Sequence, residues 1–143
     1  MKISKSILEG AAGTTAMTIF SQYLSDKKHK NYSEPDLLAK FVHRSFPALG
    51  DRQARLAGWA LHYGIGAAMM VAFRAVAKRG GIAKPLVYGV IGGLVGVAVW
   101  QQLFRKSSAP PRTDLAGFLT QLVPAHVIFS LPLLFDRSDR EQQ

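Results

Sequence analysis

Two histidines are the residues of this sequence best suited to chemistry, because each lies in a long stretch without Lys, Arg, Asp or Glu. His62 lies in the uncharged stretch 56–73, and His126 lies in the uncharged stretch 115–135. An imidazole in such a setting can carry a proton, ligate a metal or bind a neighbouring helix. Three interpretations of the pair remain open: a proton or ion relay, bis-imidazole ligation of haem b, and hydrogen bonding between helices, which is the commonest role.

Further polar side chains fall at a similar depth to the two histidines. Tyr63 follows His62 directly, and three glutamines belong to the same half of the predicted spans: Gln101, Gln102 and Gln121. Together with His62 and His126 they predict a polar cavity between helices. Such a cavity is the part of the chain that a small transporter or a proton conduit would use.

One acid and one base also lie inside apolar stretches. Glu9 is near the start of the first stretch, and Arg74 is near the end of the second. Antiparallel neighbouring helices would bring the two charges to the same depth. We therefore expect an intramembrane Glu9–Arg74 ion pair, the alternative being that each side chain reaches the lipid headgroups separately.

The sequence contains no pattern that predicts an enzyme. With no cysteine in 143 residues, thiolate nucleophiles, Cys-ligated zinc and iron–sulfur clusters are excluded. There is no nucleophile paired with a base, no phosphate-binding loop and no metal-ligand spacing. We expect no catalytic residue and no metal site, and no cofactor unless the histidines hold haem.

The elements that must position these residues are membrane-spanning helices. Uncharged stretches cover 56–73, 85–104 and 115–135, and a fourth, 7–24, contains only Glu9. A bilayer requires about 20 predominantly apolar residues per helix. We predict an all-α, polytopic bundle of four transmembrane helices in one domain, 1–143, with helices at about 4–24, 55–77, 85–104 and 114–135. The GxxxG pairs Gly89/Gly93 and Gly92/Gly96 are predicted helix-packing positions.

The first connector predicts an amphipathic helix at about 34–46. Ser33-Glu-Pro-Asp36 has the composition of a helix start, and apolar residues follow at helical spacing. This helix is expected either to lie along anionic headgroups or a partner, or to cover the end of the bundle as a lid. Trp59 and Trp100 are expected in an aromatic belt at the membrane interface.

The charge distribution favours lipid headgroups over nucleic acid as the partner of the basic residues. The net charge is +9, from 18 basic and 9 acidic residues. Four spans put both termini on one side, and the basic residues then divide almost evenly between the two sides, which leaves the orientation open. We expect a bilayer with anionic headgroups and, as protein partners, further copies of the chain or other membrane subunits.

Two short similarities concern the whole architecture. Residues 9–13 are similar to 88–92, and Leu61-His62-Tyr63 is similar to Ala125-His126-Val127, which suggests two tandem helical hairpins.

Three segments also resemble a known family: residues 9–17 of the first helix, the Ser-Glu-Pro connector, and His62-Tyr-Gly-Ile-Gly66. The family is that of the YagU-like uncharacterised bacterial inner-membrane proteins. That resemblance implies a multi-pass inner-membrane protein that contributes to acid-stress survival, and it draws attention to His62 with Gly64 and Gly66.

From these observations we predict a small, multi-pass, non-enzymatic membrane component or subunit of an assembly, linked to stress adaptation. The alternative is a small transporter or a proton or ion conduit that uses the intramembrane histidines.

Overall fold

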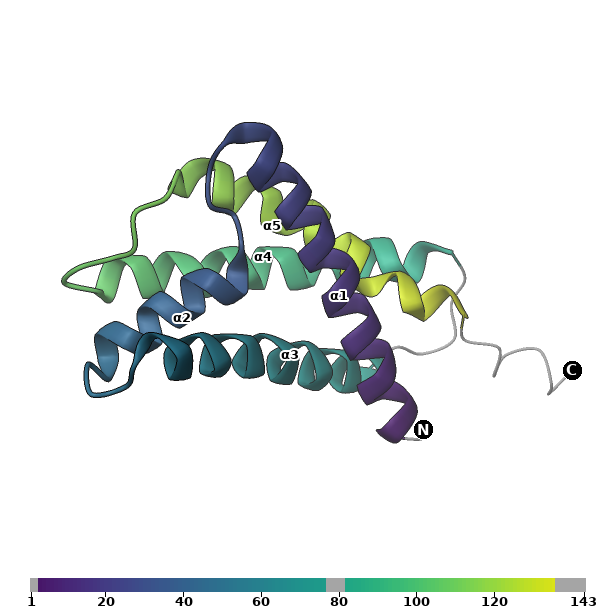
Figure 1. Cartoon of the computed structure of the whole chain (residues 1–143). Helices are drawn as coiled ribbons and strands as arrows, with labels where there is room; N and C mark the ends of the chain where they lie inside the picture. Colours follow the sequence, from purple (N-terminus) through teal and green to yellow (C-terminus); the bar gives the residue numbers. More distant parts are fainter. Residues whose placement is uncertain (1–2, 77–81, 136–143) are drawn as a thin grey trace, which may run out of the picture.

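The fold is all-helical over the residues that the structure, a computed structural model, describes, which are 3–76 and 82–135. Five α-helices follow one another along the chain (Figure 1). They are α1 (Ile3–Lys28), α2 (Glu34–Ser45), α3 (Asp51–Val76), α4 (Ala83–Lys106) and α5 (Leu115–Ser130), and a 3-10 turn, η1 (Leu131–Phe135), extends α5. Residue 77, the predicted end of the second span, lies outside the described residues.

The helices pack in pairs that α1 joins together. α4 packs against α5, α2 packs against α3, and α1 contacts both α3 and α5. In Figure 1 α1 crosses α3 steeply, whereas α4 and α5 lie at a shallower angle to each other, so the two predicted hairpins are not arranged alike. The shorter α2 lies beside the first half of α3.

Glycine and other small residues bring the helix backbones close together. A Cβ atom placed on Gly10 of α1 would lie 2.7 Å from the Cα atom of Ala67 on α3. On α4, a Cβ atom at Gly93 would lie 2.6 Å from the Cα atom of Val123 on α5, and Gly89 meets Val127 in the same way. These contacts have the character of small-residue packing between membrane helices.

All four glycines predicted as packing positions face neighbouring helices. Gly89 and Gly93 meet the backbone of α5, and Gly96 meets the ring of His126, also on α5. Gly92 faces α3 instead, with Phe73 3.0 Å from the position of its missing Cβ atom.

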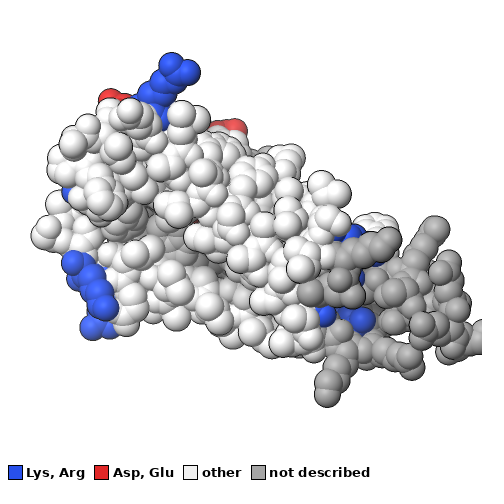
Figure 2. All heavy atoms as spheres, turned by 90° about the horizontal axis from the view of Figure 1, so that it is seen from below, with Lys and Arg blue, Asp and Glu red and all other residues white. Residues whose placement is uncertain are grey.

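Large apolar side chains lie on the outside of the bundle as well as in its interior. The exposed face of α4 carries seven of them: Leu86, Val87, Ile91, Leu94, Val95, Val99 and Leu103. Apart from Met17, the buried residues of α1 are by contrast small or hydroxylated: Ser6, Gly10, Gly13, Thr14, Ser21 and Ser25. In Figure 2 uncharged side chains cover the middle of the molecule, and Lys and Arg gather towards its two ends.

Three helices are long and apolar enough to cross a membrane: α3, α4, and α5 together with η1. This finding is consistent with a membrane protein. α1 does not belong to this set, because its many Gly, Ser and Thr residues lower its hydropathy, so the predicted four spans are not confirmed. The last span is not regular α-helix throughout, because α5 ends at Ser130 and the 3-10 turn η1, which contains Pro132, completes it.

α2 forms where the connector helix was predicted, and one of its faces packs on α3. Pro35 and Ala39 are buried against α3. A Cβ atom placed on Gly58 of α3 would lie 2.6 Å from both the Pro35 O and the Ala39 N atoms. The helix is therefore docked along the side of the bundle, and it does not cover the bundle's end as a lid.

Gly58→Ala is expected to destabilise the protein, whereas Gly64→Ala on the same helix is not. The added methyl group meets the backbone of α2 at position 58, and overpacking of this kind costs about 1–3 kcal/mol. At position 64 a Cβ atom would have nothing within 4 Å. Ala there causes no clash, and its higher helix propensity should stabilise α3 by about 1 kcal/mol. The measurement is the free energy of unfolding in detergent micelles, and equal effects of the two substitutions would contradict the packing of α2 on Gly58.

Candidate functional site

Two hydroxyl groups of α1 reach the helices on either side of it. Thr18 Oγ1 lies 2.9 Å from His62 Nε2 on α3, and Ser21 Oγ donates a hydrogen bond of 2.9 Å to Gln121 Oε1 on α5. Thr18 and Ser21 are three residues apart, so they share one face of α1. His62 and Gln121 are 6% and 4% exposed. One face of α1 thus joins α3 to α5 through buried polar contacts.

His126 adds a second imidazole to this cluster. Its Nδ1–H donates a hydrogen bond of 2.8 Å to the Leu122 carbonyl one turn earlier on α5. The ring packs on α4 at Gly96, where a Cβ atom would lie 3.1 Å from Cε1 and 3.4 Å from Nε2. The acceptor Leu122 follows Gln121 directly, so His126 lies about one turn of α5 beyond the residue that binds Ser21. We define the polar centre as Thr18, Ser21, His62, Gln121 and His126.

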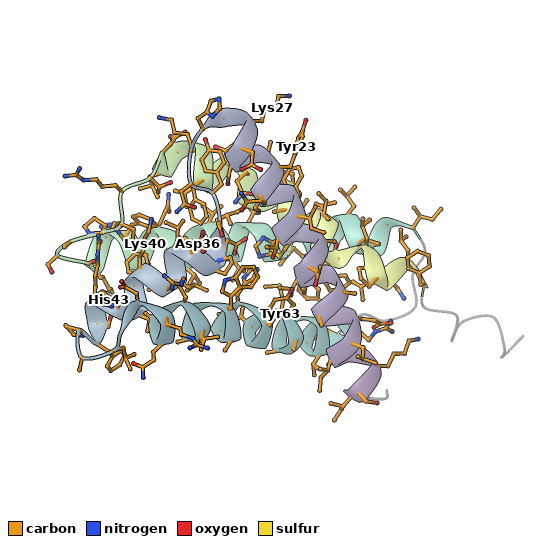
Figure 3. All side chains as sticks on the ribbon, in the orientation of Figure 1. Tyr23, Lys27, Asp36, Lys40, His43 and Tyr63 are labelled. Carbon is orange, nitrogen blue, oxygen red and sulfur yellow. The ribbon has the colours of Figure 1, made fainter. Side chains whose placement is uncertain are left out.

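The other residues of the predicted cavity lie elsewhere. Tyr63 is half-buried, its hydroxyl lies 2.9 Å from Thr15 Oγ1, and its ring stacks on Trp59. Figure 3 labels Tyr63 on α3. Gln101 and Gln102 are exposed on α4. The structure thus brings His62, Gln121 and His126 together and leaves Gln101 and Gln102 outside, because similar depth does not ensure that side chains point towards the same helix.

Glu34 is a buried ionisable residue whose sequence context predicts only a helix start. It is 7% exposed, and its Oε1 atom has no hydrogen-bond partner among the described residues. Burial raises the pKa of Glu34 to about 7, and a hydrogen bond from the Trp100 side chain on α4 acts in the opposite direction. Trp100 is 5% exposed. Its predicted place in an interface belt is therefore wrong, since it packs in the core beside Glu34.

The connector before Glu34 is fixed to both α1 and the start of α5. The Tyr32 N–H donates to Ser25 Oγ at 2.9 Å, and the Tyr32 hydroxyl donates to Asp114 Oδ2 at 2.7 Å. Hydrogen bonds from the Tyr32 hydroxyl and the Gly117 N–H lower the pKa of Asp114, and the same Tyr32–Asp114 bond raises the pKa of Tyr32. This junction holds the chain where Glu34, two residues later, enters the bundle.

The predicted pair of Glu9 and Arg74 is present near the start of α1 and the end of α3. Arg74 Nε donates to Glu9 Oε2 at 2.5 Å, and Arg74 Nη2 donates to Glu9 Oε1 at 2.7 Å. The side chain of Glu9 is 14% exposed and that of Arg74 is 9% exposed. Lys5 Nζ also lies 3.9 Å from Glu9 Oε1. A bidentate guanidinium–carboxylate contact is the strongest ion-pair geometry that proteins use.

The two histidines are not arranged as a pair of haem ligands in this structure. Nε2 of His62 contacts Thr18 of α1, and the ring edge of His126 that carries Nε2 lies against Gly96 of α4. A porphyrin between the rings would require both nitrogens to leave these helices. Over residues 3–76 and 82–135 there is also no group of three His, Asp or Glu side chains that could hold a metal ion.

Comparisons with protein-family profiles, with curated protein sequences and with solved structures give no match to this chain.

Glu9→Gln and Arg74→Gln are each expected to lower the free energy of unfolding by about 3 kcal/mol, because each leaves the other charge buried without its main partner. The double substitution should cost much less than the sum of the two. The measurement is a double-mutant cycle in detergent micelles. Strictly additive effects would show that the two charges are stabilised separately.

Glu34→Gln is expected to remove a pH dependence of stability. The pKa of Glu34 is raised from 4.5 to about 7 on folding. The native state therefore holds the proton more tightly, and stability is highest below pH 4.5 and falls as the pH rises through 7. The loss corresponds to about 3 kcal/mol at 1.36 kcal/mol per pKa unit.

The check is thermal unfolding of the wild-type protein and the variant between pH 5 and pH 8. Asp36→Asn is the matched control, because Asp36 is a half-buried acid on the same helix. A variant whose stability falls with pH as steeply as that of the wild type would contradict this role of Glu34.

Proposed function

We propose that this chain is a non-enzymatic, multi-pass protein of the bacterial inner membrane that acts as a helical scaffold, either as a homo-oligomer or as a subunit of a larger assembly. The observation that carries the proposal is the placement of large apolar side chains on the outside of the bundle. The exposed face of α4 from Leu86 to Val99 offers a continuous apolar surface to lipid or to another membrane helix.

The proposal includes α1 as a fourth crossing, with both termini on one side. The contacts of α1 support this, because Glu9 pairs with Arg74 at the end of α3, whereas Ser25 contacts Tyr32, which binds Asp114 at the start of α5. Its outward side chains include the exposed Ile3, Ile7, Leu8 and Ile19. The low hydropathy of α1 then results from the small and hydroxylated residues that face the other helices.

A scaffold accounts for the polar centre better than a conduit does. His62 and His126 each have a hydrogen-bond partner, and the ring of His126 is packed against glycine. Such contacts specify which helix faces meet in a bilayer. The resemblance to YagU-like proteins adds a role in stress adaptation to this proposal, on the residues of the first two predicted spans.

Single-cysteine labelling tests the four-span arrangement directly, because the natural chain contains no cysteine. Ser4→Cys should react with a membrane-impermeant maleimide on one side of inner-membrane vesicles. Lys28→Cys and Arg52→Cys should react on the other side. All three positions are exposed in the structure.

Labelling of Ser4→Cys and Lys28→Cys from the same side would overturn the crossing by α1. Release of the protein by alkaline carbonate would overturn the membrane scaffold as a whole. Leu94→Cys, at an exposed position in the middle of α4, is the control and should stay unlabelled from either side.

A further inference from the structure

Two charged hollows lie beside the C-terminal half of α2. The first has a volume of about 500 Å³, and its charged or titratable lining residues are Asp36, Lys40, His43, Arg44, Asp51 and Arg55. The second has a volume of about 540 Å³ and is bordered by His43, Arg44 and Lys106. Arg44 and His43 belong to both hollows, so the two adjoin. Figure 3 labels Asp36, Lys40 and His43 along α2.

Positive charge predominates in both hollows. The first contains three permanent cations and two carboxylates, and the second contains Arg44 and Lys106 and no acid in its lining. Nδ1 of His43 lies 3.8 Å from Oδ1 of Asp51. A ligand that neutralises this surface therefore carries negative charge on both sides of Arg44.

Arg44 is held in place before any ligand binds. Its Nη1 atom donates to the carbonyl of Ala109, in the connector between α4 and α5. A guanidinium has five N–H donors, and its planar fork matches the oxygens of a phosphate group. One contact to Ala109 leaves the remaining donors for an anion.

The first hollow lies beside the start of α3, where it is lined by Asp51, Ala54 and Arg55. Ala39, which lines it, contacts Gly58, and Gly58 is seven residues into α3. This spacing corresponds to about 10 Å along the helix axis. In the membrane arrangement proposed above, Lys40 and Asp36 therefore lie beside the outer part of the bilayer, where charged groups are stable only if water or a headgroup solvates them.

An apolar groove lies next to α2 at the same end of the bundle. It has a volume of about 710 Å³ and is lined by Val42, Phe46 and Leu49 together with α3 residues between Ala57 and Ala68. A ligand with charged and apolar parts suits this neighbourhood, because Val42 and Phe46 of the groove lie within one turn of His43 and Arg44, which line the hollows.

We propose that the two hollows bind the headgroup of one anionic glycerophospholipid that carries two phosphodiester groups. One phosphate lies with Lys40 and Arg55, the other lies with Lys106, and Arg44 contacts both. The acyl chains lie along apolar side chains such as those of the groove. This site rests on the proposed function, since it requires the hollows to face a bilayer, and basic pockets between membrane helices are known to suit such headgroups.

The test is lipid titration of the full-length protein in detergent, followed by native mass spectrometry. The probes are tetraoleoyl diphosphatidylglycerol, dioleoyl phosphatidylglycerol and dioleoyl phosphatidylcholine. The expected order of affinity places the two-phosphate lipid at least tenfold above the one-phosphate anionic lipid, with the zwitterionic lipid weakest. Lys40→Gln/Arg55→Gln and Lys106→Gln should each reduce the binding of the two-phosphate lipid about tenfold.

Lys27→Gln/Arg112→Gln is the matched control, because it also removes one lysine and one arginine, both exposed and neither in the lining of the hollows. This control should change the affinity less than twofold. Lys40→Arg/Arg55→Lys should retain binding, and circular dichroism of every variant excludes loss of the fold.

Three results would overturn the site. They are equal affinity for the two anionic lipids, an equal loss in the Lys27/Arg112 control, and displacement of the lipid by millimolar inorganic phosphate, which would identify a free-phosphate site. Failure of the scaffold proposal is recognised separately, because the labelling and carbonate experiments do not depend on the headgroup.

Discussion

Close approach of helix backbones at small residues is the constraint on which the other contacts of this bundle depend. Gly10 allows α1 to meet the backbone of α3 at Ala67, and Gly13 of α1 lies against the Phe129 carbonyl of α5. Thr18 and Ser21 have short side chains, and they reach His62 and Gln121 only because these backbones are close. A larger residue at Gly10 or Gly13 would separate the helices and break polar contacts two turns away.

This constraint also explains why hydroxyl, amide and imidazole groups lie among the core residues while many large apolar side chains face outwards. Lipid surrounds an apolar side chain as favourably as another helix does, so apolar contacts provide little force for association in a membrane. Hydrogen bonds and close packing stabilise helix association instead, and both depend on which helix faces meet. α1 has the least apolar composition of the four long helices, and it has the ion pair of Glu9 with Arg74 near its start and the Ser25–Tyr32 contact near its end.

The parts of the fold that local sequence determines were predictable. Charge-free stretches located α3, α4 and α5, and the Ser-Glu-Pro-Asp start located α2 to within a residue of its observed bounds. The similar depth expected for Glu9 and Arg74 predicted their ion pair, and the pair is present. Depth alone does not give the direction of a side chain around the helix axis, and for this reason Gln121 lies in the polar centre whereas Gln101 is exposed.

The burial of Glu34 was not predictable, because its cause is distant in the sequence. A carboxylate in the first turn of a helix is normally solvated and favoured by the helix dipole. Here the Tyr32 hydroxyl binds Asp114, 82 residues later, and the connector therefore carries Glu34 into the core beside Trp100. The pattern of α2 itself is that of an ordinary amphipathic helix, and no feature within 34–46 indicates a buried acid.

The two ends of α2 therefore experience very different surroundings within one short rigid element. Its twelve residues span about 18 Å. The N-terminal end holds a carboxyl group that is most stable when protonated, and the C-terminal end holds Arg44 against the connector that leads to α5. Because a helix of this length is rigid, the packing of Glu34 in the core and the contact of Arg44 with Ala109 fix one docked position of α2 at both of its ends.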